Sequence, residues 1–101
     1  KAPAILSRAG LKVAIMTDHP VIPIQYLPVC ASIAVREGMD EMEALKAITI
    51  YPAQITGLDD RVGSLEEGKD ADVVIFDGHP LDVRSRTQWV FIDGNPVFRR
   101  E

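Results

Sequence analysis

Residues 11–20 read LKVAIMTDHP, an apolar stretch that runs directly into a carboxylate, an imidazole and a proline. The stretch before it, residues 3–10 (PAILSRAG), is typical of the last turns of a helix that ends at Gly10. A helix followed at once by an apolar strand is one half of an α/β repeat. Because residues 13–16 show no polar alternation, the strand predicted at residues 12–16 is expected to be covered on both faces, as in a parallel sheet.

Three further helices are expected in the first half of the chain. Pro28 suits a first helical position, and the apolar run after it continues to Gly38. Asp40, followed by Glu43 three residues later, is an acidic form of the capping box and predicts a helix start. Pro52 predicts the start of a short third helix.

Strand signals dominate the second half. Residues 72–76 are a short β-branched run, and residues 88–98 hold two apolar segments separated by Asp93-Gly94. An Asp-Gly pair in this position predicts a hairpin with a type I′ turn. Residues 63–70 (GSLEEGKD) are a turn-rich acidic segment. The change of character near residue 58 is the candidate domain boundary.

Composition and charge exclude several classes of function. The chain has 101 residues, of which 47% are hydrophobic and 26% charged, as in ordinary globular proteins. A formal net charge of −4 offers no basic stripe for nucleic acid, and no apolar stretch approaches the roughly 20 residues that cross a bilayer. The one cysteine, Cys30, forms no internal disulfide, which fits a reducing compartment. We therefore expect a cytoplasmic protein that binds neither nucleic acid nor membrane.

The end of the first predicted strand carries the residues with the clearest chemical potential. Asp18 and His19 follow the strand at the edge where α/β folds place functional groups. A carboxylate there can bind a divalent metal or act as a general base, yet an aspartate before a proline-containing loop is also an ordinary turn residue. The residue types alone leave both interpretations open. His19 is the weaker candidate, because adjacent side chains of a strand point to opposite faces.

Other conspicuous side chains are interpreted as structural. Cys30 lies within an apolar helix and is expected to be a small core residue. His79 lies in a D-G-H-P turn and is expected to be solvated. Trp89, Phe91 and Phe98 are expected to pack in the core of the sheet, because no basic residues interleave them as in a nucleic-acid stacking platform.

Several segments, in this order, resemble the C-terminal end of the metal-dependent amidohydrolase superfamily, most closely its imidazolonepropionase-like and Xaa-dipeptidase-like members. The segments are TDHP at residues 17–20, REGM at 36–39, ALKAITIYPAQITGL at 44–58, GSLEEGKDADVVIFDGHP at 63–80 and WVFIDGNPVF at 89–98. The most distinctive is G-x-x-E-x-G-K-D-A-D-x-V, which starts at Gly63. The resemblance covers essentially the whole chain.

This resemblance implies an α/β fold with two parts. Residues 1–58 would be the last strand and helices of a TIM (β/α)8 barrel, and residues 59–101 the C-terminal strands of a small composite β-sandwich. Asp18 would be the family's strand-8 aspartate, which contacts the metal centre and moves a proton from the metal-bound water to the leaving group. His19 would line the substrate pocket. In the distinctive motif, Gly63, Gly68, Asp70 and Asp72 would be structural.

The implied function is metal-dependent hydrolysis of C–N bonds other than ordinary peptide bonds. The resemblance implies a small-molecule substrate such as a cyclic amide or an N-acyl or dipeptide-like compound, a divalent metal with zinc expected, and a homo-oligomer. Deamination of a ring stays open as a variant. The family's H-x-H pair, central carboxylate or carboxylated lysine, and two later histidines are missing, and the sequence starts in mid-pattern with Lys1. The chain is therefore expected to be the inactive C-terminal part of a longer enzyme. The alternative is a free-standing, non-catalytic α/β interaction or oligomerisation module.

Overall fold

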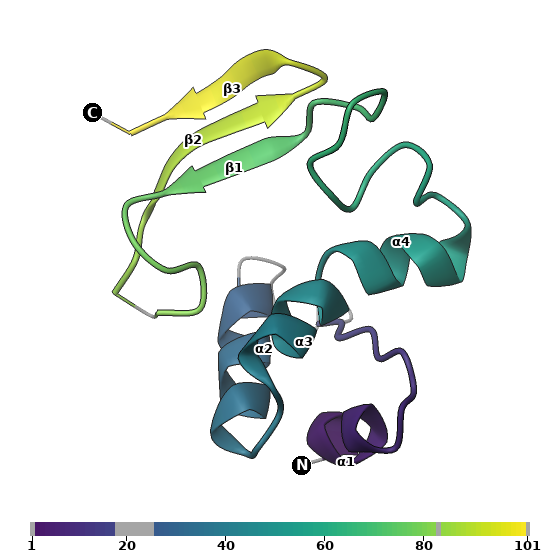
Figure 1. The fold of residues 1–101 in the computed structure, drawn as a ribbon. Coiled ribbons are helices and arrows are strands. Elements are labelled where there is room, and N and C mark those ends of the chain that lie inside the picture. Colours follow the sequence, from purple (N-terminus) through teal and green to yellow (C-terminus); the bar gives the residue numbers. More distant parts are fainter. Residues whose placement is uncertain (1, 18–25, 83, 101) are drawn as a thin grey trace.

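A computed structural model describes residues 2–17, 26–82 and 84–100 and shows a helical part beside a small antiparallel sheet (Figure 1). The helices are α1 (Ala2–Arg8), α2 (Leu27–Arg36), α3 (Glu41–Ala47) and α4 (Ile50–Thr56). The strands are β1 (Val73–Phe76), β2 (Thr87–Ile92) and β3 (Asn95–Arg99). Within these residues, we find no helix whose length and apolar character would let it cross a membrane.

Local signals define the end of α2 and the start of α3 as predicted, and α2 begins one residue before Pro28. Helix α2 carries Pro28 in its first turn and is followed by Gly38 at a φ of +112°, a conformation that favours glycine. Asp40 precedes α3 in an extended conformation, and its carboxylate accepts a hydrogen bond from the Glu43 backbone N–H at 3.2 Å. The prediction that Asp40 caps the helix is therefore confirmed. The Glu43 carboxylate instead accepts a hydrogen bond from the Tyr51 hydroxyl at 3.0 Å, so the second half of the capping box is not formed.

Helix α4 begins earlier than predicted. Its N-cap is Thr49, so Pro52 is the third helical residue and not the first. A proline is tolerated there because the N–H groups of the first turn have no acceptor within the helix. Gly57 ends the helix in the left-handed conformation, with a φ of +79°.

The three strands form one sheet in the order β1-β2-β3, and both neighbouring pairs are antiparallel. Asp93 and Gly94 connect β2 to β3 with φ values of +52° and +80°. Two successive positive φ values are what a type I′ turn requires, so the predicted hairpin is confirmed.

The aromatic residues of the sheet are only partly buried. Trp89 and Phe91 are half-buried and stack with their ring centroids 5.5 Å apart. Phe98 lies on β3, the outer strand of the sheet, and is 43% exposed. The prediction that it packs in the core is wrong for the described structure, because β3 is exposed along its whole length.

The hydrophobic core lies among the helices and is made mainly of small side chains. Its buried members are Ala4, Ala31, Ala34, Met39, Ala44, Ala47 and Leu81. Small side chains let helices approach closely. Leu81 is the one member of this cluster that comes from the loop between β1 and β2, so it connects the sheet to the helical core. Cys30 of α2, predicted to be in the core, is half-buried.

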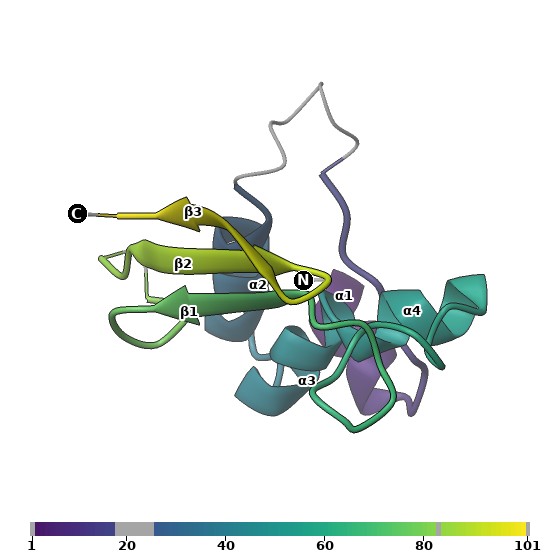
Figure 2. The same ribbon diagram turned by 90° about the horizontal axis from the view of Figure 1, so that it is seen from above.

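Residues 11–17 do not form the predicted strand. They run as extended chain from α1, and Figure 2 draws them as a thin tube without a strand arrow. One backbone hydrogen bond, from Ile15 N–H to Ala47 C=O at 3.0 Å, fastens the segment to the end of α3. A strand exists only through pairing with a neighbour, and the described residues supply none here.

Burial alternates along the same segment. Val13 and Ile15 pack against the helical core, whereas Ala14 and Met16 are exposed, Met16 by 73%. The expectation that both faces are covered is therefore wrong for the described part of the chain. The helices cover one face of the segment and leave the other open.

Candidate functional site

The predicted catalytic loop joins the extended segment to α2. Asp18 and His19, the two predicted site residues, lie outside the described residues, so their contacts are not part of the structure. The described residues that border them are Thr17 and Tyr26.

Thr17 is the residue directly before Asp18, and it is buried, with 3% of its surface exposed. Its hydroxyl Oγ1 has no hydrogen-bond partner among the residues that the structure describes. Burying a hydroxyl without a partner costs about 1–3 kcal/mol. Among the described residues, an unsatisfied polar group therefore lies immediately before the predicted catalytic aspartate, and the sequence had given no sign of it.

The described residues do not supply a ligand set for the expected metal. Among residues 2–17, 26–82 and 84–100, no three His, Cys, Asp or Glu side chains come together as a metal site would need. Asp18, the metal ligand predicted from the sequence, lies outside these residues, so its role stays a prediction.

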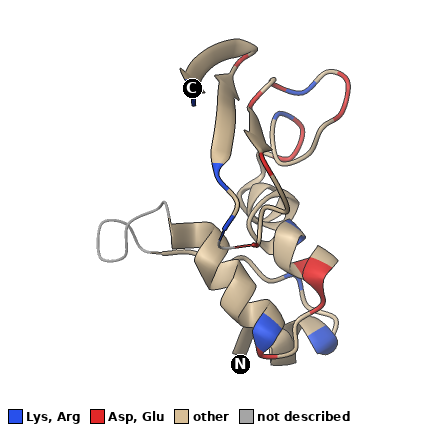
Figure 3. Ribbon diagram, turned by 90° about the vertical axis from the view of Figure 1, so that its left-hand side faces the viewer, with Lys and Arg blue, Asp and Glu red and all other residues tan. Residues whose placement is uncertain are grey.

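The distinctive motif around residues 63–72 has contacts that fit a structural role. Arg61 donates a hydrogen bond from Nη2 to Asp70 Oδ2 at 2.8 Å. Asp72 Oδ1 accepts a hydrogen bond from the Asp93 backbone N–H, also at 2.8 Å. Figure 3 shows acidic and basic residues mixed along the segment between α4 and β1. The two aspartates thus hold the segment and the hairpin turn in place.

Side chains within the motif also satisfy one another. The Ser64 hydroxyl donates to Glu66 Oε1 at 2.5 Å and accepts from Lys69 Nζ at 2.7 Å. The hydrogen bond from Ser64, followed by the charge of Lys69, lowers the pKa of Glu66. This carboxylate is therefore kept ionised and engaged, as expected of a structural group.

Gly63 is required by both its backbone and its surroundings. Its φ is +102°, and a Cβ at this position would lie 2.8 Å from the Cβ of Ala53 and 3.1 Å from the Cα of Ile50. A side chain would collide with α4. The glycine thus allows the chain to turn closely against this helix.

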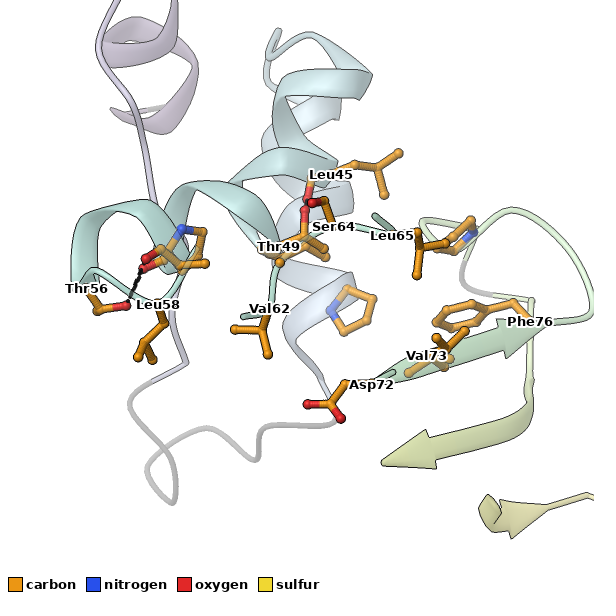
Figure 4. A pocket seen from close by; sticks show the side chains of 17 residues that line it. Leu45, Thr49, Thr56, Leu58, Val62, Ser64, Leu65, Asp72, Val73 and Phe76 are labelled. Carbon is orange, nitrogen blue, oxygen red and sulfur yellow. Dashed lines mark hydrogen bonds between the residues drawn. The ribbon is translucent and has the colours of Figure 1, made fainter. Parts of the chain in front are cut away.

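A hollow lies between the helical part and β1 (Figure 4). Its volume is about 630 Å³, and apolar side chains dominate its lining, among them Leu45, Val62 and Phe76. The Thr49 hydroxyl donates to the Leu45 carbonyl at 2.7 Å, so it is engaged with the backbone. The side chains that line this hollow therefore form an apolar packing surface.

His79 is solvated, as its turn predicted, with 43% of its side chain exposed, and it has two contacts besides. Its Nε2 lies 2.6 Å from Glu41 Oε1, and its Nδ1 accepts a hydrogen bond from the Leu81 backbone N–H at 3.1 Å. The turn also folds back onto the start of α3, a long-range contact that the local sequence does not indicate.

Asp82 and Arg84 form a separate exposed pair in the same loop. Arg84 donates from Nη2 to Asp82 Oδ2 at 3.0 Å and from its backbone N–H to Oδ1 at 2.9 Å. The side-chain hydrogen bond from Arg84 is the main cause that lowers the pKa of Asp82 to about 2.

Comparison with known proteins now defines the class. Residues 1–98 match the Amidohydrolase family, and the chain belongs to that family. An amidohydrolase of known structure from Thermotoga maritima MSB8 shares 49% sequence identity and superimposes with a TM-score of 0.94 over 98% of this chain and 26% of its own.

Named relatives agree with this class. Imidazolonepropionase of Thermoplasma volcanium is 41% identical over 102 residues, which cover 91% of this chain and 25% of the relative. Amidohydrolase tasK of Hapsidospora irregularis is 34% identical over 89 residues, or 88% of this chain and 9% of the relative. The predicted resemblance is confirmed, and the chain spans a quarter or less of the length of these two relatives.

Proposed function

We propose that this chain is the C-terminal part of a metal-dependent amidohydrolase that hydrolyses C–N bonds other than ordinary peptide bonds in a small-molecule substrate. The observation that carries the proposal is the family match over residues 1–98. The relative named imidazolonepropionase supports a cyclic amide as substrate, with N-acyl or dipeptide-like compounds and ring deamination as variants to be tested.

The arrangement of the helical part supports a barrel origin for residues 1–58. Helix α1, the extended segment 11–17 and α2 follow one another as helix, strand and helix do in an α/β barrel. The helices cover one face of the segment, as the outer helices of a barrel cover its strands. We assign residues 59–101, which contain the sheet, to the β-sandwich part.

The burial pattern of the extended segment supports a role for Asp18. Side chains of an extended chain alternate between two faces, so even-numbered residues share one face. Ala14 and Met16 are the even-numbered residues that the helices leave exposed. We assign Asp18 to this open face in the complete enzyme, where the other barrel strands would bring the missing ligands.

In the proposed enzyme, Asp18 contacts the metal and carries a proton to the leaving group. When bound, a divalent metal, with zinc expected, lowers the pKa of a water molecule. The Asp18 carboxylate is the group of this chain that accepts and delivers a proton. His19 is proposed to line the substrate pocket, and the isolated chain is proposed to be inactive because it supplies one ligand only.

The test uses the complete enzyme with the substitution Asp18→Asn. An amide cannot act as the base, so kcat is expected to fall by about 10²–10⁴-fold, with the thermal unfolding temperature unchanged. Turnover is measured on a cyclic amide, an N-acyl amino acid and a dipeptide, and bound zinc by mass spectrometry. Asp70→Asn is the matched control and should retain activity. Near-normal kcat in Asp18→Asn would remove the proposed proton carrier.

One observation favours the alternative of a non-catalytic interaction module. Met16 and the outer strand β3 expose apolar side chains that an association partner can cover. An H-x-H motif after a strand in the upstream reading frame supports the enzyme. A start codon directly before Lys1 supports the module.

A further inference from the structure

We propose that His79 is a proton-sensitive polar bridge, made of one hydrogen bond and one ion-pair contact, that connects the loop between β1 and β2 to helix α3. Its two ring nitrogens face two different parts of the chain. Nε2 contacts Glu41 in the first turn of α3, and Nδ1 contacts the backbone of Leu81.

Leu81 makes this bridge important for the docking of the sheet. It is 9% exposed and is the member of the helical core cluster that the loop contributes. The Leu81 N–H donates to Nδ1 at 3.1 Å, so His79 holds the backbone of the residue that enters the core. The Asp82 N–H donates to the His79 carbonyl at 3.0 Å and closes the same turn.

The loop between β1 and β2 is not fully packed against the helices, so a polar contact can help to hold it. A second hollow, of about 230 Å³, remains between this loop and the first turn of α2 and is lined by Tyr26, Pro28 and Leu81 among others. Apolar contact therefore does not hold the loop everywhere. Figure 1 shows the loop reaching from the sheet toward α2.

The two contacts require one particular form of the imidazole. Nδ1 accepts a hydrogen bond and must carry a lone pair, whereas Nε2 faces a carboxylate and must carry the proton. The bridge is thus complete in the neutral Nε2–H tautomer. Protonation at Nδ1 places two N–H groups against each other and removes the acceptor of Leu81, while the contact with Glu41 persists.

The charged groups around His79 favour keeping one contact when the other is lost. Glu41 faces it from α3, and Asp82 lies in its own loop, where hydrogen bonds from Arg84 are the main cause of the lowered pKa of that carboxyl. Both carboxylates attract a protonated imidazole. Acid therefore releases the Leu81 end of the bridge and leaves His79 attached to α3.

Two variants separate the two ends in the complete protein. His79→Asn places a carbonyl oxygen near the position of Nδ1 and retains an acceptor for Leu81. His79→Gln places its amide nitrogen near the position of Nε2 and retains the donor to Glu41. The readouts are the tautomer, from NMR with ¹⁵N-histidine, and the exchange rate of the Leu81 amide, from ¹⁵N-leucine labelling with Leu81→Met for assignment.

At pH 8 we expect the Nε2–H tautomer, slow Leu81 exchange in the wild type and in His79→Asn, and about fivefold faster exchange in His79→Gln, as the loss of one hydrogen bond predicts. Rates are corrected for the intrinsic effect of pH. At pH 5 the exchange rate of the Leu81 amide in the wild type should approach the rate in His79→Gln. The rate in His79→Asn should be the same at both pH values. A proton on Nδ1 at pH 8, or equal Leu81 exchange in the wild type and His79→Gln at pH 8, would overturn the proposal.

Discussion

Two segments without regular secondary structure, residues 61–72 and residues 11–17, lie next to the helical core. They differ in whether their side chains find partners within the described residues. In the first segment, Asp70 pairs with Arg61 and Asp72 holds the hairpin turn. In the second, Ile15 makes one backbone hydrogen bond and Met16 is 73% exposed.

The difference shows which segment makes its stabilising contacts within this chain. The segment before β1 finds its partners within the described residues, so its structure is determined by this chain. The helices cover the extended segment on one face only. Its other, apolar face is exposed, and the strands of the proposed barrel would cover it. Substitutions in the two segments should therefore respond differently to the rest of the protein.

The largest effect is expected for Met16→Lys in the complete enzyme. If neighbouring strands cover Met16, a lysine there loses hydration and packing, and the free energy of unfolding falls by about 3 kcal/mol. Met42→Lys is the matched control: Met42 is 58% exposed on α3, and its substitution should change stability by less than about 0.5 kcal/mol. Urea unfolding measures both. Equal, small effects would contradict the barrel assignment.

A second prediction concerns Gly63→Ala. The added Cβ combines a positive φ with a collision against Ala53, so we expect a loss of about 2–3 kcal/mol. Gly68→Ala provides the comparison, because Gly68 also has a positive φ, +87°, but nothing lies within 4 Å of its Cβ position. It should lose about 1 kcal/mol. Thermal unfolding tests the order, and the reverse order would mean that the contact with α4 is unimportant.

A smaller effect is expected for Asp70→Asn. The side chains of Arg61 and Asp70 are 69% and 29% exposed, so water screens much of their attraction. The loss should be about 0.2–1 kcal/mol. A double-mutant cycle with Arg61→Gln measures the pair directly. A coupling energy of zero would show that Asp70 acts through its backbone, whose N–H donates to the Arg61 carbonyl at 2.7 Å.

The smallest effect is a titration shift in the loop after β1. Arg84→Gln removes the main cause of the low pKa of Asp82, which should rise from about 2 toward 3.8. The pair contributes stability above the unfolded-state pKa of about 3.9, and this contribution is lost as the pH falls through about 2. Carboxyl NMR titration of both proteins measures the shift. An unchanged Asp82 pKa would mean that groups other than Arg84 lower it.

Much of the local structure could be predicted from the sequence because its signals act between near neighbours. Asp40 and Glu43 defined the start of α3, and Asp93-Gly94 defined the hairpin turn. The start of α4 was misplaced because Pro52 is allowed at several positions of a first turn. The site prediction rests on Asp18, which no described contact tests, while the buried hydroxyl of Thr17 carried no signal in the sequence.

Sequence by itself determined the start of α3, the ends of α2 and α4 at their glycines, the hairpin and the membership of the amidohydrolase family. Capping residues, prolines and glycines control the backbone within a few positions, and family motifs keep their order along the chain. Tertiary structure alone decided that alanines form the core, that His79 bridges to Glu41, and that one face of residues 11–17 is covered. These features depend on contacts between residues far apart in the chain, which only the folded arrangement brings together.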